Sequence, residues 1–153
     1  LLCMSTLVFI GVKYVNKAQN IMEIDQVRSI VSTLPIQYKA TLAGVVLNQG
    51  KRKDGHQTTG EVYSTYMQIC KHFSLDSLSQ RRVGHIISEL DMQGMINAKI
   101  VSLGRQGRTK FISMAIDQNQ IDELFAEDAF LSDISIELTK SGNYISSTQL
   151  RLI

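Results

Sequence analysis

The most informative part of the sequence is SQRRVGHIISELDMQGMINAKIVSLGRQGRTK, which runs from Ser79 to Lys110. Its first half places apolar residues at the helical spacing i, i+3, i+4 and i+7: Val83, Ile86, Ile87 and Leu90. Ser79 is a favourable N-cap, and Gly94 supplies the left-handed residue that commonly follows a helix. This pattern predicts an amphipathic helix over about residues 79–93.

The second half of the same stretch predicts a β-hairpin. Residues 95–103 and 109–116 alternate in character as strands do. Between them, GRQGR places Gly104 and Gly107 where a tight turn needs positive φ. A helix followed directly by such a hairpin is typical of a recognition helix and its wing.

The remaining chain supplies the other elements of a winged helix. Further helices are predicted over residues 16–34, 36–48, from Thr58 or Thr59 to 73, and 118–130, with residues 1–12 as the end of a helix. The order predicts a mainly α fold with a small β-hairpin wing, a winged helix-turn-helix. We expect a helical segment over 1–34, a winged-helix domain over 35–130, and a tail over 131–153 to which no element is assigned.

The charge distribution favours a polyanion as partner. The net charge is only +2, but residues 51–110 hold ten Lys/Arg against five Asp/Glu, a balance of +5. Residues 117–138 hold seven Asp/Glu and no Lys/Arg, a balance of −7. A basic centre of this kind is an expected footprint of nucleic-acid binding.

The predicted helix 79–93 carries the first set of candidate DNA contacts. At about 100° per residue, the face opposite its apolar stripe is free of acids and holds Arg81, His85, Ser88 and Met92, with Ser79 and Gln80 at its N-terminal end. Arg reads guanine through two donors, and a recognition helix leads with its N-terminal residues. Arg82 lies on the flank and suits a phosphate. The alternative is a merely solvated helix surface.

The turn and two basic segments complete the candidate interface. Turn geometry does not require cations, yet Arg105, Arg108 and Lys110 surround the two glycines. The predicted wing contacts, to a minor groove or to phosphates, are Gly104, Arg105, Gln106, Gly107, Arg108, Thr109 and Lys110. Lys51, Arg52 and Lys53 in a predicted loop, and Thr59 at a helix start, are further candidates. A solvated basic hairpin is the alternative.

Signatures of other function classes are missing from the sequence. It holds no G-x-x-x-x-G-K-[ST], G-x-S-x-G, H-E-x-x-H or C-x-x-C motif, so we predict no catalytic, cofactor-binding or metal site and no enzyme activity. Cys3 and Cys70 match no paired ligand spacing. The apolar residues 1–12 are about half the length of a membrane span, so no membrane partner is expected.

The chain resembles the C-terminal winged-helix domain of archaeal origin-recognition proteins, replication initiators of the AAA+ class. The resemblance covers about residues 15–128. Its motifs are Leu34-Pro35 with Lys39, Gly60-Glu61-Val62-Tyr63 with Tyr66, Arg81-Arg82-Val83, Glu89-Leu90-Asp91, Gly94 and Gly104-Arg105-Gln106-Gly107-Arg108. Residues 13–33 resemble the end of that family's lid domain, so 1–34 is interpreted as a remnant of the lid.

The resemblance implies binding of double-stranded DNA at replication origins, with the recognition helix in the major groove and the wing on the minor groove. The family's ATPase module is not expected in this chain, so ATP or ADP and Mg would belong to that module. The replicative helicase and other initiator subunits are the implied protein partners. The implied location is the cytoplasm, in association with the nucleoid.

Two other classes use the same fold. A winged-helix transcriptional regulator would normally add a dimerisation helix, and residues 118–130 could provide one, although no effector pocket is visible in the sequence. A winged-helix protein-interaction module would suit the acidic residues 117–137, whereas the basic helix and wing argue against it.

Overall fold

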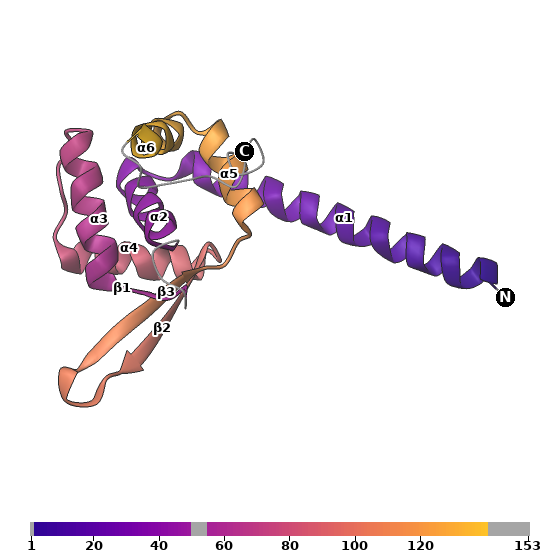
Figure 1. The fold of residues 1–153 in the computed structure, drawn as a ribbon, viewed down its shortest axis with the longest axis horizontal. Helices are drawn as coiled ribbons and strands as arrows, with labels where there is room; N and C mark the ends of the chain where they lie inside the picture. Colours follow the sequence, from indigo (N-terminus) through magenta and orange to yellow (C-terminus); the bar gives the residue numbers. More distant parts are fainter. Residues whose placement is uncertain (1, 50–54, 141–153) are drawn as a thin grey trace. The chain divides into compact units, whose positions relative to one another are not determined.

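The computed structural model describes residues 2–49 and 55–140 (Figure 1). The chain divides into two compact units, Leu1–Thr33 and Leu34–Ile153. The first unit is helix α1, Leu2–Thr33. It is one continuous helix rather than the separate segments 1–12 and 16–34 that we predicted, because no proline interrupts it before Pro35.

The second unit is a winged helix, as predicted. Its helices are α2 Ile36–Gln49, α3 Thr59–His72, α4 Gln80–Met92, α5 Gln118–Glu127 and α6 Ala129–Lys140. Its strands are β1 Gln57–Thr58, β2 Ile96–Ser102 and β3 Arg108–Met114, with the short 3-10 turn η1 Gly104–Gln106 between β2 and β3. Figure 1 shows the β2–β3 hairpin reaching away from the helices.

Helix α4 forms as its apolar stripe predicted. The residues of that stripe are all buried: Val83, Ile86, Ile87 and Leu90. Ser79 is the N-cap, and Gly94 follows the helix with φ 77°. Burial of each large aliphatic side chain contributes about 1.5–3 kcal/mol, so this stripe fixes α4 against α2, α3 and the base of the sheet.

The sheet has three antiparallel strands in the order β1-β3-β2, and sequence patterns predicted only two of them. Strand β1 has two residues, too few for a period, and lies in what we interpreted as a loop. Its Gln57 is buried and donates from Nε2 to the Val45 carbonyl at 2.7 Å. A long-range contact therefore holds β1, and local sequence carries no signal for it.

The closing helix predicted over 118–130 is two helices, and α6 occupies part of the tail left unassigned. Asp128 breaks the helix with φ −88° and ψ 124°, and its Oδ1 accepts from the amides of Phe130 and Leu131, both at 3.1 Å. Leu131 and Ile134 are buried where α6 packs against α2 and α5. Tertiary packing thus stabilises a helix whose own period is weak.

Asp128 also forms an ion pair with a residue of α2. Its Oδ2 lies 2.5 Å from Lys39 Nζ on α2, and both side chains are only 14% exposed. Burial raises the pKa of Asp128, but the hydrogen bonds from Lys39 and from the amides of Leu131 and Phe130 outweigh that effect. The pKa of Asp128 therefore lies below its ordinary value.

Candidate nucleic-acid interface

A surface groove lies between α4, the start of α3 and the hairpin. We call it the helix–wing groove, and its volume is about 650 Å³. Eight of the predicted contact residues line it: Thr59, Gln80, Arg81, His85, Ser88, Arg108, Thr109 and Lys110. The other lining residues are Gly60, Gly84 and Ile100. The fold thus gathers residues that are separated by up to 51 positions in the chain.

The N-terminal end of α4 faces solvent. The Ser79 hydroxyl accepts from the Arg82 amide at 3.4 Å and so caps the helix. Gln80, Arg81 and His85 are exposed and line the helix–wing groove. Arg82 is exposed but does not line the groove, which agrees with its predicted place on the flank.

The turn before α4 is held from the core. The Tyr66 hydroxyl lies 2.5 Å from Gln37 Oε1, to which it donates, and it accepts from the Leu78 amide at 3.0 Å. Gln37 in turn donates to the Asp76 carbonyl at 2.8 Å. Burial is the main reason why the pKa of Tyr66 is raised to about 12, so the hydroxyl remains a donor at any physiological pH.

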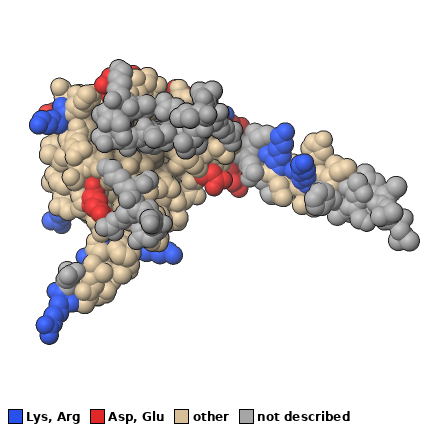
Figure 2. Space-filling view, in the orientation of Figure 1, with Lys and Arg blue, Asp and Glu red and all other residues tan. Residues whose placement is uncertain are grey.

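The wing turns on its two glycines. Gly104 and Gly107 have φ of 64° and 88°, a region that disfavours side chains. The Leu103 amide donates to the Gly107 carbonyl at 2.8 Å and closes the turn. Arg105 is exposed at this turn, and the side chain of Gln106 lies outside the described residues. Figure 2 shows Lys and Arg side chains at the free end of the hairpin.

Helix α3 begins beside the groove. Thr58 is its N-cap, and a capping box joins the Thr58 amide to Glu61 Oε2 at 2.7 Å and the Glu61 amide to Thr58 Oγ1 at 3.4 Å. Thr59 is therefore the first helical residue rather than the cap. The predicted basic patch Lys51, Arg52 and Lys53 lies outside the described residues.

The helix–wing groove is basic. Its lining residues include Arg81, Arg108 and Lys110, and none of them is Asp or Glu. The acids of α4 have partners elsewhere: Glu89 accepts from the Tyr38 hydroxyl on α2, and Asp91 Oδ1 accepts from the Ala98 amide at 3.1 Å.

The contact between Tyr38 and Glu89 also changes the tyrosine. The hydrogen bond to Glu89, with a smaller contribution from burial, raises the pKa of Tyr38. Tyr38 therefore stays a neutral donor and keeps the Glu89 carboxylate on the α2 side of α4.

Sequence reasoning did not foresee several features of the groove. Ile100 lines the groove as an apolar side chain that is 69% exposed, and Gly84 leaves room in the middle of α4. Lys110 extends toward α4, where its Nζ lies 2.5 Å from Ser88 Oγ. The strand register, which places Lys110 opposite Ile100, is the signal that could have revealed this shared face.

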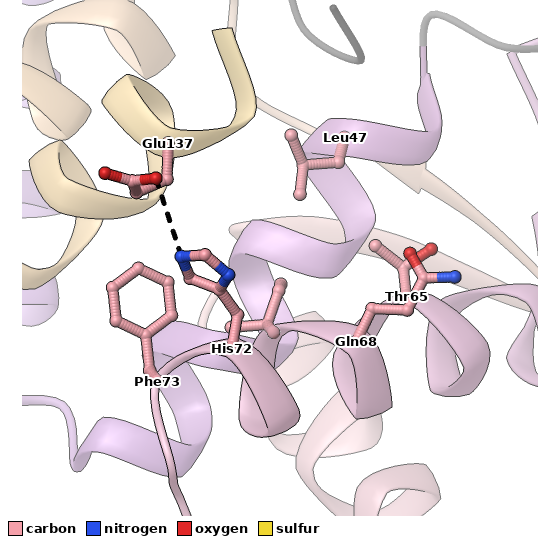
Figure 3. A pocket seen from close by; sticks show the side chains of 7 residues that line it. Leu47, Thr65, Gln68, His72, Phe73 and Glu137 are labelled. Atoms are coloured by element: carbon pink, nitrogen blue, oxygen red, sulfur yellow. Dashed lines mark ion pairs between the residues drawn. The ribbon is translucent and has the colours of Figure 1, made fainter. Parts of the chain in front are cut away.

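A smaller pocket lies elsewhere in the second unit, between α2, α3 and α6 (Figure 3). We call it the His72 pocket. Its volume is about 140 Å³, and it is lined by Leu47, Thr65, Gln68, Ile69, His72, Phe73 and Glu137. His72 Nε2 lies 3.6 Å from Glu137 Oε2, and a dashed line in Figure 3 marks this contact.

The described residues show neither a cluster of metal ligands nor a helix that could span a membrane. No group of three or more His, Cys, Asp or Glu is arranged to hold a metal ion there. Within the same residues, every helix is either too short or too polar to span a membrane.

Helices α2, α3 and α4 are followed by the hairpin of β2 and β3, which projects from the body, and α4 lies beside the basic groove. This arrangement defines a winged-helix protein. Residues 29–124 match the C-terminal winged helix domain of CDC6, and the chain belongs to that family. The resemblance seen in the sequence is therefore confirmed.

Relatives in archaea agree with this assignment. The chain is 44% identical over 117 residues to ORC1-type DNA replication protein 1 of Methanosarcina mazei, covering 76% of this chain and 28% of that protein. It is 40% identical over 130 residues to the ORC1-type DNA replication protein of Pyrococcus abyssi, covering 85% and 31%. The chain thus spans less than a third of these relatives.

A solved structure of similar fold is the Aeropyrum pernix ORC1 protein in complex with DNA. The two chains superpose with a TM-score of 0.69 at 34% identity. The match covers 80% of this chain and 31% of the other.

Proposed function

We propose that this domain binds double-stranded DNA at replication origins. The observation that carries the proposal is the helix–wing groove, which presents Arg81 and Arg108 to solvent without an acidic residue among its lining. Two comparisons support it: the relatives are DNA replication proteins, and the solved relative is in complex with DNA.

In the proposed complex, α4 enters the major groove with its N-terminal end. Arg81 would donate two hydrogen bonds to a guanine edge, and Gln80 and His85 would add base contacts. Ser79 and Arg82 are placed for phosphates, as is Thr59 beside the helix. Because base contacts carry sequence information and phosphate contacts do not, α4 would contribute more to sequence discrimination than the wing.

The wing would lie against the minor groove. Arg105 and Arg108 supply positive charge, Gly104 and Gly107 let the backbone approach closely, and Thr109 offers a hydroxyl to a phosphate. The wing would respond to minor-groove width and phosphate spacing rather than to base identity.

The test is the salt dependence of duplex binding. Neutralising about four to six phosphates should give a log–log slope of about −4 to −5 in a titration followed by fluorescence anisotropy. Selection from a random duplex library should enrich one sequence. A binding constant that does not change with salt would contradict the proposal.

We further propose that this domain performs no catalysis and needs no nucleotide or Mg itself. The helicase and other initiator subunits are the protein partners that the family suggests, and association with the nucleoid would follow from DNA binding. ATP turnover that a point mutation in this chain abolishes would contradict the first statement.

A protein-interaction role is a second candidate, favoured by the His72 pocket. Its walls include Leu47, Ile69 and Phe73, and its volume of about 140 Å³ suits one apolar side chain of a partner. Substituting Leu47 by a larger residue would fill the pocket and should leave DNA binding intact.

A further inference from the structure

Lys110 is a cation of the helix–wing groove whose charged group is hydrogen-bonded to α4. Its Nζ lies 2.5 Å from Ser88 Oγ and 3.5 Å from the Gly84 carbonyl oxygen. Ser88 Oγ lies 3.1 Å from the same carbonyl, to which it donates. The ammonium therefore donates to the Ser88 hydroxyl while that hydroxyl donates to Gly84, and the three groups form a closed set of hydrogen bonds.

Arg108 provides the contrast on the same strand. Alternate residues of a strand share a face, so Arg108 and Lys110 lie on the face that also carries the buried Ile112. Arg108 is exposed, whereas Lys110 is half-buried. The two cations lie on the same face and carry the same charge, but the structure gives hydrogen bonds to α4 for Lys110 alone of the two.

A second contact fixes the hairpin nearer its base. Asp91 Oδ1 on α4 accepts from the Ala98 amide at 3.1 Å, and Ala98 is opposite Ile112. Lys110 is opposite Ile100, two residues farther toward the turn, which is about 7 Å along the strand. Two points of attachment define an angle between hairpin and helix, whereas one point would allow the hairpin to pivot.

We propose that Lys110 is a positioning residue that fixes the angle between the wing and α4, and not a phosphate contact. The inference deepens the proposed function, on which its DNA part rests. Helix and wing can occupy adjoining grooves of one duplex only at a suitable angle, and lost hydrogen bonds at Ser88 would let the wing move out of register with α4.

The first test needs no DNA. Lys110→Met keeps most of the length of the side chain and removes its donors with its charge, and Ser88→Ala removes the acceptor without changing charge. Both variants should speed amide hydrogen exchange along residues 97–113, measured by NMR, whereas the matched variant Arg108→Met should not. Equal exchange in all three variants and the parent would overturn the proposal.

The second test is a double-mutant cycle on duplex binding. Loss of one hydrogen bond should weaken binding by about fivefold in Lys110→Met and in Ser88→Ala, and the double variant should be no weaker than either. If the two residues instead contact DNA independently, their effects will multiply and the proposal fails. Parallel thermal unfolding shows that each variant is folded.

A third measurement separates positioning from general stability. Arg108→Ala should weaken binding in the parent but much less in the Lys110→Met background, because the wing is no longer placed on the duplex. An undiminished effect of Arg108→Ala would overturn the proposal. Should the parent itself bind duplex without salt dependence, the proposed function fails, and the hydrogen-exchange test still decides the role of Lys110.

Discussion

The helix–wing groove and the side of the domain formed by α2 and α6 differ in what their charged side chains do. In the groove, Arg81 and Arg108 have no carboxylate within salt-bridge distance among the described residues. On the other side, Lys39 pairs with Asp128 at 2.5 Å, and both of these side chains are only 14% exposed. Charges paired inside the protein stabilise the fold, whereas cations without an internal partner remain available to a polyanion.

We expect the largest change, a loss of stability, when the ion pair between Lys39 and Asp128 is broken. Asp128→Asn keeps a good N-cap for α6 but leaves the Lys39 ammonium, 14% exposed, without its counter-charge. The free energy of unfolding should fall by about 3 kcal/mol, measured by urea denaturation at pH 7. Asp133→Asn, an exposed neighbour on α6, is the control and should change it by less than about 0.5 kcal/mol.

The same pair predicts a pH dependence. Since the pKa of Asp128 is lowered in the folded protein, its contribution is present above the unfolded value of about 3.9 and is lost as pH falls through the folded value. Asp128→Asn should lack this part of the acid destabilisation. Parallel stability curves for parent and variant below pH 4 would show that the pair does not act in this way.

A smaller effect, on discrimination, should come from Arg81. Arg81→Ala removes a bidentate donor and should cost about 1–3 kcal/mol on the preferred duplex and much less on a scrambled one. Its exposed side chain leaves the core intact, so the melting temperature should barely change. Discrimination that survives this change, but not the wing changes, would make the wing the reader.

The wing arginines should act mainly through charge. Arg105→Ala and Arg108→Ala should each lower the salt slope by about one and weaken preferred and scrambled duplexes by similar factors. Lys99, exposed on the opposite face of the hairpin, is the matched control. If Lys99→Ala lowers the slope as much, the effect is general electrostatics and not the helix–wing groove.

The smallest effect is expected at Gly84, and it separates stability from binding. Apart from the neighbouring residues and the helix's own backbone, no atom lies within 4 Å of a Cβ placed there, and alanine in a helix is about 0.5–1 kcal/mol more favourable than glycine. Because Gly84 lines the groove, Gly84→Ala should raise the melting temperature slightly and weaken duplex binding a few-fold. Tighter binding would mean that DNA does not enter the middle of the groove.

Local patterns in the sequence were enough to predict α4 and the wing. The stripe from Val83 to Leu90, the Ser79 cap and the turn glycines each act within a few residues, and the structure has each of them. Strand β1 and helix α6 were missed because Gln57 and Leu131 are held by residues far away in the chain.

In the candidate site, too, local patterns predicted some features, and contacts between distant residues produced the others. Eight of the seventeen predicted contacts line one groove, since they lie on elements that were correctly placed. The pairing of Lys110 with Ser88, and that of Tyr38 with Glu89, join residues 22 and 51 positions apart. A single sequence gives the face of each helix and strand but not which side chains meet between them.

The central claim is that DNA binds at the helix–wing groove and not at the side of the domain formed by α2 and α6. An NMR titration of labelled protein with a duplex tests this claim most directly, because it reports every amide at once. We predict shifts concentrated at Gln80, Arg81 and Arg108, with little change at His72 and Glu137. Shifts centred on the His72 pocket, with the groove unaffected, would contradict the account.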